Sequence, residues 1–569
     1  MHIDAVPNRG SRPTFLLRES YREGKRIRKR TLANLSRLSD EQIGVIRGVL
    51  HGEKFSRPEE LFECVSSLHH GHVEAVRTAM RRLKFDSLLA SLPSRERDIV
   101  CAMVTAQILA PQSKLAMTRW WRTTTIPGVF EVYEAVEEDL YASLDWLYER
   151  QDRIEKKLAS RHLSEGGMVL YDLSSSYFEG KSCPLAAFGH NRDGKKGKLQ
   201  VNYGLLTDTK GRPVAISVFK GNMGDAKTLL SEVQNVREKF GIKTLVMIGD
   251  RGMIGQKQID GLKGLEGVGW ITALKTGAIR GLVEQGHIQM GLFDERNIFE
   301  LTHPDYPGER LMACRNPELA KQRAWVRQSL IEATKKELDK VRRLAGKRLK
   351  GRDVIGVRVG KVVNKYKVAK HFDLDIRDDG FEYLVNEERV AAEAALDGIY
   401  VIRTSVPADK LSTDDAVRSY KLLTQVERAF RHIKTMGLHV RPIRHRLEER
   451  VRAHLFLCML AYYVMWNMIE AWRPIIFADE EQEAKKRRDP VAPSKRSKTA
   501  EAKVSSKILS DGTVVHSFDS LLHNMSGIVR NVCRRKNGDA KDATFEIVTT
   551  PDPKQMQALE LLETISCSQ

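Results

Sequence analysis

Three acidic residues stand where the sequence could bring carboxylates together. Asp172 ends the apolar run MVLYD, Asp250 ends the run TLVMIGD, and Glu427 lies in YKLLTQVERAFRHIK (420–434). Two aspartates at strand ends and a glutamate on an adjacent helix can hold two divalent metal ions about 3.5–4 Å apart, which serve phosphodiester chemistry. Magnesium suits such a set because it prefers hard oxygen ligands. Each acid alone is weak support, because an acid that ends a buried strand is more often a turn residue or a helix cap.

The stretch around Glu427 has helical periodicity. One stripe is apolar and consists of Leu423, Val426, Phe430 and Ile433. The stripe beside it carries a tyrosine, an acid and two cations at spacings of seven, four and three: Tyr420, Glu427, Arg431 and Lys434. The simpler interpretation is a surface helix with a Glu427–Arg431 ion pair, worth only ~0.3–0.5 kcal/mol.

A basic loop follows Asp172. The segment GHNRDGKKGK (189–198) contains Arg192, Lys195 and Lys196. Cations beside the proposed site would contact DNA phosphates and add counterion release to affinity. The alternative is a solvated hairpin tip.

The elements that would position the acids form an α/β pattern. Strands alternate with helices between 168 and 275, including a hairpin of 199–207 with 212–219 and an amphipathic helix over 225–240. The sheet resumes at 398–405, and the capping box at Ser412 predicts a helix that runs to about Met436. Together they predict a mixed sheet whose strand ends carry Asp172 and Asp250.

The rest of the chain falls into further regions. We expect two strands around Gly24 at the N-terminus, helices from about Pro58 to His162, and a β-prone, basic insertion that includes DVIGVRVGKVVNKYKVAKHF. The predicted regions are a small basic β-rich region (1–56), a mainly helical DNA-binding or dimerisation region (57–165), the first part of the core (166–278), a β-rich basic insertion (279–397), the second part of the core (398–478), a flexible linker (479–510) and a small C-terminal domain (511–569).

Composition narrows the function class. The chain has 94 basic and 74 acidic residues, a net charge of +20, which indicates a polyanionic partner such as nucleic acid unless it serves only solubility.

Seven scattered cysteines without a Cys-x-x-Cys pair indicate a reducing compartment and no structural zinc, and His69, His70 and His72 beside Cys64 are interpreted as surface histidines of a helical stretch. The longest apolar run, 455–466, is too short for a membrane span and predicts a buried helix.

Several of these segments resemble one family. Tyr420, Glu427 and Lys434 reproduce three positions of the Tyr-x2-Arg-x3-Glu-x6-Lys signature of the insertion-sequence-four-like DDE transposases. YDLSSSYFEG, FKGNMGDAKTL and IGDRGM also resemble the aspartate regions of its sixteen-thirty-four-like group. The resemblance covers about 165–475. It implies a ribonuclease-H-like core in which three acids, Asp172, Asp250 and Glu427, bind two Mg²⁺ ions, with Mn²⁺ as a substitute.

The resemblance also implies how DNA is held. Lys434 would contact a phosphate near the cleavage point, and Tyr420 would position the DNA end. The family's arginine falls at Leu423. That phosphate contact is therefore either absent or supplied by one of three other cations, Lys421, Arg428 or Arg431.

These observations give a working hypothesis and two alternatives. The hypothesis is an enzyme of the bacterial cytoplasm, associated with the nucleoid, that binds the terminal inverted repeats of its insertion sequence. It would cut and join double-stranded DNA, at the element ends and the target, as a homodimer without a membrane partner. The alternatives are a catalytically silent DNA-binding derivative and a ribonuclease-H-like nuclease unconnected with transposition.

Overall fold

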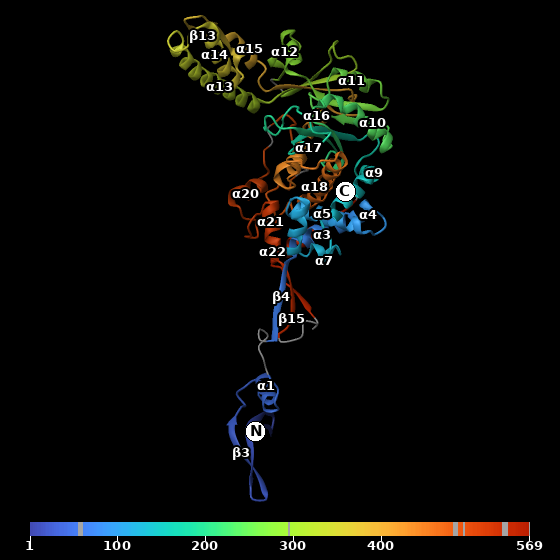
Figure 1. The fold of residues 1–569 in the computed structure, drawn as a ribbon, viewed down its shortest axis with the longest axis vertical. Helices are drawn as coiled ribbons and strands as arrows, with labels where there is room; N and C mark the ends of the chain where they lie inside the picture. Colours follow the sequence, from blue (N-terminus) through green and yellow to red (C-terminus); the bar gives the residue numbers. More distant parts are fainter. Residues whose placement is uncertain (55–60, 294–295, 482–487, 493–494, 537–543, 568–569) are drawn as a thin grey trace. The chain divides into compact units, whose positions relative to one another are not determined.

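The chain is described by a computed structural model that covers residues 1–54, 61–293, 296–481, 488–492, 495–536 and 544–567 (Figure 1). It divides into two compact units, each of which is discontinuous in sequence. The smaller unit comprises Met1–Leu68 and Val529–Thr549, and the larger comprises His69–Ile528 and Thr550–Gln569.

The smaller unit contains two three-stranded sheets. The first is an antiparallel sheet of β1 (His2–Asn8), β2 (Ser11–Glu23) and β3 (Arg26–Asn34), followed by α1 (Asp40–Leu50). Gly24 takes a φ of +62° in the β2–β3 turn, so the two predicted strands are confirmed and a third precedes them. The second sheet has the order β16-β15-β4, with β4 at Phe62–His69, β15 at Val529–Arg535 and β16 at Phe545–Val548.

The prediction of a helix at Cys64 and His69 is therefore wrong. Both residues lie on β4, where exposed residues are interspersed with half-buried ones. Pairing with β15, more than 450 positions away, overrides the local pattern, since Glu63 bonds to Arg534 across a separation of 471.

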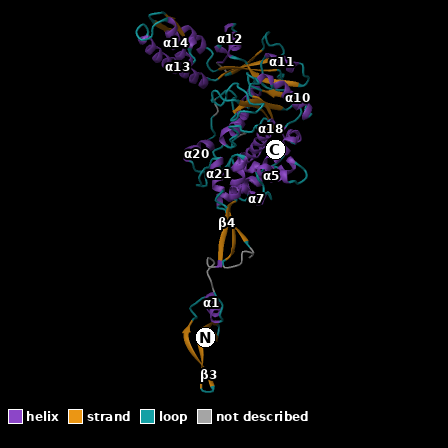
Figure 2. Cartoon of the chain, in the orientation of Figure 1, coloured by secondary structure: helices purple, strands orange, loops and turns teal. Residues whose placement is uncertain are grey.

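An eight-stranded mixed sheet runs through the larger unit (Figure 2). Its order is β10-β11-β14-β9-β8-β5-β6-β7. The first three strands in sequence, β5, β6 and β7, form an antiparallel meander; β8 lies parallel to β5 and β9 parallel to β8. The bounds are β5 Met168–Tyr177, β6 Gln200–Thr207, β7 Pro213–Lys220, β8 Leu245–Ile248, β9 Val268–Ala273, β10 Ile298–Leu301, β11 Arg310–Arg315 and β14 Ile399–Thr404. The predicted mixed α/β sheet and its hairpin are confirmed.

Helices precede, interrupt and follow this sheet in the chain. Those before it confirm the predicted helical region: α3 Gly71–Arg82, α4 Phe85–Leu89, α5 Arg95–Leu109, α6 Lys114–Trp120, α7 Ile126–Val129, α8 Glu137–Glu149 and α9 Gln151–His162. Those within and after it are α10 Leu229–Lys239, α11 Gln256–Lys263, α12 Thr276–Glu284, α16 Thr413–Lys421, α17 Leu423–Arg431 and α18 Glu448–Ala471. Short 3₁₀ turns lie at Trp121–Thr123, Asp225–Lys227, Met290–Phe293 and Ala369–His371, and a π-helical segment lies at His432–Met436.

The central helix α18 confirms the predicted buried helix. Its residues from Leu455 to Met465 are all buried, and it packs against α5, α8 and β7. Among the described residues, no single helix is long and apolar enough to span a membrane; α5 and the helix after it meet that test only as a pair, bent by 87°.

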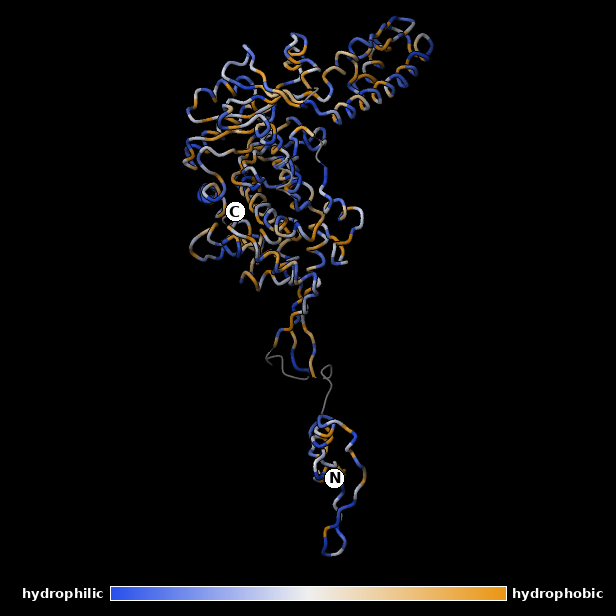
Figure 3. Tube along the Cα trace, turned by 180° about the vertical axis from the view of Figure 1, so that it is seen from behind, coloured by the Kyte–Doolittle hydropathy of each residue, from blue (hydrophilic) through white to orange (hydrophobic). Residues whose placement is uncertain are grey.

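The insertion is mainly helical, so the prediction of a β-rich insertion is wrong. Its long elements are α13 (Pro317–Leu344) and α14 (Arg352–Tyr366), which form a small core with the strand pair β12 (Phe372–Ile376) and β13 (Phe381–Val385), followed by α15 (Glu387–Ala394). Along these helices hydrophilic and hydrophobic segments alternate (Figure 3). The β-branched residues of α14 suggested strands, but those that are buried recur at helical spacing: Ile355, Val359, Val362 and Val363.

The predicted flexible linker and separate C-terminal domain are also corrected. In 479–510 the structure places α20 (Lys498–Ser506) and a fully buried Val491; part of that predicted linker lies outside the described residues. In the tail, α21 (Phe518–Met525) and α22 (Pro553–Glu563) pack on α3, while β15 and β16 belong to the smaller unit. The indole nitrogen of Trp472 donates to the Ala558 carbonyl (2.9 Å), which anchors α22 on the core.

Candidate active site

The register of β5 and β8 sets Asp172 and Asp250 level with one another. The last pair between these parallel strands is Leu170 with Ile248, and each aspartate lies two residues beyond its member of that pair. Neighbouring strands are about 4.8 Å apart, so both positions lie at the same end of this strand pair, Asp172 on β5 and Asp250 in the turn after β8. However, β5 continues to Tyr177 beside β6. Asp172 therefore lies within its own strand, beside the point where the neighbouring strand β8 has ended.

Each aspartate also has a local bond. Asp172 Oδ1 accepts from the backbone N–H of Leu173 (2.8 Å). Asp250 Oδ1 accepts from the N–H groups of Gly252 (3.0 Å) and Met253 (2.8 Å), as expected of a turn-capping residue. Both acids thus retain Oδ2, for which no bond to the described residues is found, so the turn role and a ligand role are compatible.

The third acid is carried by α17, which packs on β5 and β6. The predicted apolar stripe is confirmed, because all four of its members are buried, and the Phe430 ring meets Tyr203 of β6 edge-on with centroids 5.8 Å apart. Glu427 faces solvent. Within the described part of the chain it forms no ion pair, so the alternative of a Glu427–Arg431 pair is not observed.

Electrostatics connects the three acids. The pKa of Asp172 is raised to about 7, chiefly by burial and then by the negative charges of Asp250 and Glu427; the Leu173 N–H and the Arg192 guanidinium oppose the rise. All three carboxylates therefore lie in one electrostatic neighbourhood. Their side chains are nevertheless not close together, because no three His, Cys, Asp or Glu side chains of the described ranges are grouped closely enough to hold a metal ion.

Tyr420, at the end of α16, borders the same neighbourhood. Burial first, and then the charges of Asp250 and Glu427, raise the pKa of its phenol to about 12, while Arg251 opposes them. The hydroxyl therefore stays protonated at neutral pH and can donate a hydrogen bond.

Lys434 lies in the π-helical segment and is held inside the protein. Its Nζ is 3.0 Å from Oδ1 of Asp193, whose side chain is 2% exposed and also pairs with Arg441 (2.5 Å). Asp193 Oδ2 accepts from the Tyr177 N–H (2.9 Å). Sequence reasoning missed Asp193; the signal was that it is the one acid in the basic loop GHNRDGKKGK.

The other basic residues predicted to bind DNA have different surroundings. Arg192 is half-buried and donates both to the carbonyl of Leu173 and to the carboxylate of Asp225. Lys195 and Lys196 are exposed, with the Lys195 ammonium 5.9 Å from the ring centroid of Tyr177. Arg431 is exposed as well and makes no ion pair with the described residues. Only these last three present cations to solvent.

The predicted helix from Ser412 to Met436 has a break between α16 and α17, directly before Leu423. Leu423 is buried, so it contributes to packing where the family has an arginine. Of the three cations that could replace that arginine, Lys421 donates to the Pro490 carbonyl. Arg428 and Arg431 are exposed.

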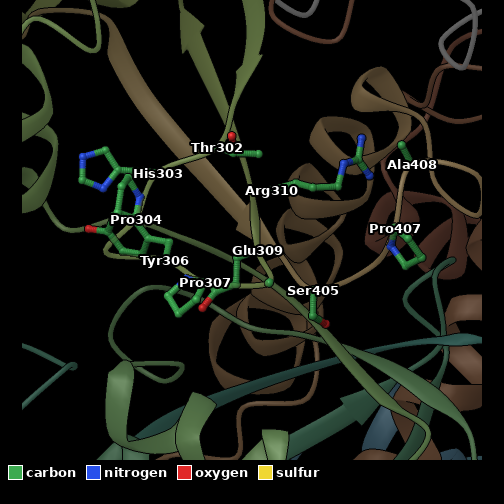
Figure 4. A pocket seen from close by; sticks show the side chains of 11 residues that line it. Thr302, His303, Pro304, Tyr306, Pro307, Glu309, Arg310, Ser405, Pro407 and Ala408 are labelled. Atoms are coloured by element: carbon green, nitrogen blue, oxygen red, sulfur yellow. The ribbon is translucent and has the colours of Figure 1, made fainter.

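A separate hollow of about 550 Å³ contains none of these residues (Figure 4). It is formed by the segments 302–310 and 405–408. Its charged groups are satisfied: Glu309 is bonded twice to Arg403 (2.6 Å each) and Arg310 twice to Glu300 (2.7 Å each). It therefore offers no free charge for a ligand.

Comparison with known families identifies the chain. The profile of the transposase DDE domain matches residues 179–464, which is half of the chain, and begins after Asp172. The profile of the IS1634 family transposase N-terminal domain matches residues 3–60. The chain therefore belongs to the DDE transposases. Within them, the N-terminal match assigns it to the IS1634 group, as the resemblance implied.

Two further comparisons are less informative. No curated protein matches the chain. A solved structure, the cryo-EM structure of the piggyBac transposase synaptic complex with hairpin DNA, is similar over 80% of this chain and 77% of that one, with 9% identity and a TM-score of 0.32. At that score the likeness carries no weight for the site.

Proposed function

We propose that this transposase binds the terminal inverted repeats of its insertion sequence and catalyses metal-dependent DNA cleavage and strand transfer. The observation that supports this most is the level placement of Asp172 and Asp250 beside a helix that carries Glu427, with all three charges coupled at Asp172. In this proposal the sheet is a ribonuclease-H-like core, which the β5–β6–β7 meander flanked by parallel β8 and β9 supports.

Asp172, Asp250 and Glu427 would hold two Mg²⁺ ions, or Mn²⁺ in their place. Their donors are hard oxygens, and the pKa of Asp172 is raised first by burial and then by the negative charges of Asp250 and Glu427, which a cation would offset. When bound, such ions polarise a phosphodiester and lower the pKa of the attacking oxygen. Glu427 is exposed and unpaired among the described residues, so it can adjust toward the two aspartates on binding.

The surrounding residues would hold DNA in place. Exposed cations, Lys195, Lys196 and Arg431, would contact backbone phosphates, and the protonated Tyr420 would donate to the DNA end. Lys434 and Arg192 would act as charges fixed near the site by Asp193 and Asp225. We further propose that a homodimer assembles on the element ends, and that the protein works in the bacterial cytoplasm on nucleoid DNA.

The test is cleavage of DNA that carries an element end, with Mg²⁺ and with a chelator. Asp172→Asn, Asp250→Asn and Glu427→Gln should each abolish Mg²⁺-dependent nicking and leave end binding within about threefold of the wild type. Glu449→Gln, an exposed acid on α18, is the matched control and should cut normally. An Asp250→Asn protein that nicks at the wild-type rate would refute the assignment.

The same assay separates the alternatives. A catalytically silent derivative would bind ends without nicking them under any metal condition. A nuclease unconnected with transposition would nick but yield no joined product when target DNA is added. The level aspartates count against the first alternative, while the buried Leu423 in place of the family arginine counts modestly for it.

A further inference from the structure

A second hollow, of about 870 Å³, carries unusual charge. We call it the basic pocket. It is formed where α5 gives way to α6 and by the loop that joins the π-helical segment to α18. Five of its lining residues are cationic and none is Asp or Glu: the cations are Lys114, Arg441, Arg444, Arg446 and Arg450.

Lys114 is the central observation. It is 3% exposed, and its ammonium has no hydrogen-bond partner among the described residues. Burial lowers the pKa of this amine to about 8. A buried cation without a partner costs free energy that a protein seldom bears without a use, and an anion in the hollow would remove that cost.

One other buried polar atom of the same lining is also unpartnered in the described chain. It is Oε1 of Gln107. The Gln107 amide is fixed, because its nitrogen donates to the Leu438 carbonyl (2.6 Å). Burial, with Lys114 and Arg450 nearby, lowers the pKa of His445 to about 3, so the positive charge of the pocket comes from lysine and arginine. The Lys114 ammonium is thus the buried donor of this lining that a bound anion would satisfy.

Three of the arginines are held in place by acids outside the lining. Arg441 pairs with Asp193. Arg450 is bonded twice to Asp145 (3.2 and 3.1 Å). Arg444 pairs with Glu179 (3.1 Å). These pairs position the guanidinium groups and leave Lys114 as the lining charge that is buried with no acid beside it.

We propose that the basic pocket binds a phosphate group, and that in the assembled complex this is a backbone phosphate of DNA. The assignment of this phosphate to DNA rests on the proposed function. Arg441 supports it, because it shares Asp193 with Lys434 and so connects the pocket to the proposed active site. A free phosphate offers the same chemistry, and two experiments on the full chain distinguish the sources.

The first experiment uses inorganic phosphate alone. Thermal unfolding is measured in phosphate and in chloride at equal ionic strength. Phosphate should raise the Tm of the wild type and not that of Lys114→Met, whose Tm in chloride should equal or exceed the wild type because an unpartnered buried charge is gone. Arg446→Gln, at an exposed position, should lose most of the phosphate effect, whereas Arg323→Gln, exposed on α13, should retain it.

Two results would overturn the pocket as a phosphate site. One is an equal phosphate effect on the wild type and both pocket variants. The other is a full phosphate effect in Arg446→Gln, and this result decides the matter by itself if Lys114→Met does not fold.

The second experiment measures affinity for element-end DNA against salt concentration. Lys114→Met and Arg446→Gln should each bind about 10- to 100-fold more weakly, with a salt slope smaller by about one. A wild type that binds no such DNA would refute the proposed function, while the phosphate experiment still judges the pocket. Variants that lose the phosphate effect but keep wild-type DNA affinity and slope would overturn the DNA half and assign the pocket to free phosphate.

Discussion

Asp193 holds Lys434 through an ion pair of 3.0 Å and holds Arg441 through the same oxygen. This arrangement ties the basic loop after β5 to the π-helical segment after α17. It also means that the lysine assigned to a DNA phosphate by family resemblance already has a protein partner. A phosphate would therefore join an existing cluster of charges rather than meet a free cation.

Replacing Asp193 should destabilise the fold strongly. Asp193→Asn leaves two half-buried cations without their shared anion, and we expect a loss of roughly 3–5 kcal/mol in the free energy of unfolding. Denaturant unfolding measures it. The control is Glu179→Gln, which breaks the exposed pair with Arg444 and should cost about 1 kcal/mol or less. Equal losses in the two variants would show that Asp193 has no special role.

The pKa of Asp172 predicts a pH-dependent stability in metal-free buffer. Since this carboxyl has an ordinary pKa of 3.8 and a folded pKa of about 7, the folded state holds the proton more tightly. The free energy of unfolding should therefore fall as pH rises from about 4 to about 7. Asp172→Asn removes this loss, so its Tm advantage over the wild type should grow across that range and level off above it. A constant Tm difference between pH 4 and 8 would contradict the prediction.

The edge-on contact between Phe430 and Tyr203 should hold α17 on the sheet and thereby keep Glu427 in position. Phe430→Ala opens a cavity beneath α17 and should cost roughly 3–5 kcal/mol, with reduced cleavage at temperatures where the protein is still folded. Phe430→Leu should cost less. Met436→Ala, at an exposed site on the adjoining segment, should change stability by at most about 0.5 kcal/mol. If Phe430→Ala cleaves DNA at the wild-type rate, the packing of α17 does not control catalysis.

Arg192 should not be replaceable by lysine. Its guanidinium donates to the Leu173 carbonyl and to Asp225 at once, and a lysine ammonium lacks the planar fork that serves both. We expect Arg192→Lys to lose about 1.5–3 kcal/mol of stability. A double-mutant cycle with Asp225→Asn, by urea unfolding, measures the coupling between the two side chains. A coupling near zero would rule out the bond as a source of stability.

The sequence predicted most of what positions the acids. The strands before Asp172 and Asp250 are apolar runs that match buried strands, and the stripe from Leu423 to Ile433 matched the buried face of α17. What it could not predict was the register that makes the two aspartates level. Register depends on pairing between strands far apart in the chain.

The errors share a physical cause. Val-rich α14 suggested strands because β-branched residues favour them locally, yet the periodicity of its buried positions specified a helix. Lys114 carries no sequence signal of its own, and Asp193 is marked only as the one acid of a basic loop. Their roles arise only when distant segments meet. Burial and partner identity are properties of the folded chain.

The sheet formed by β4 and β15 has a consequence for synthesis. A ribosome makes β4 more than 450 residues before it makes β15, the strand that must pair with it. The small unit can therefore close only after the long intervening segment, which belongs to the larger unit, has been synthesised. Until then β4 presents an unpaired strand edge, so the order of synthesis delays the closure of this sheet.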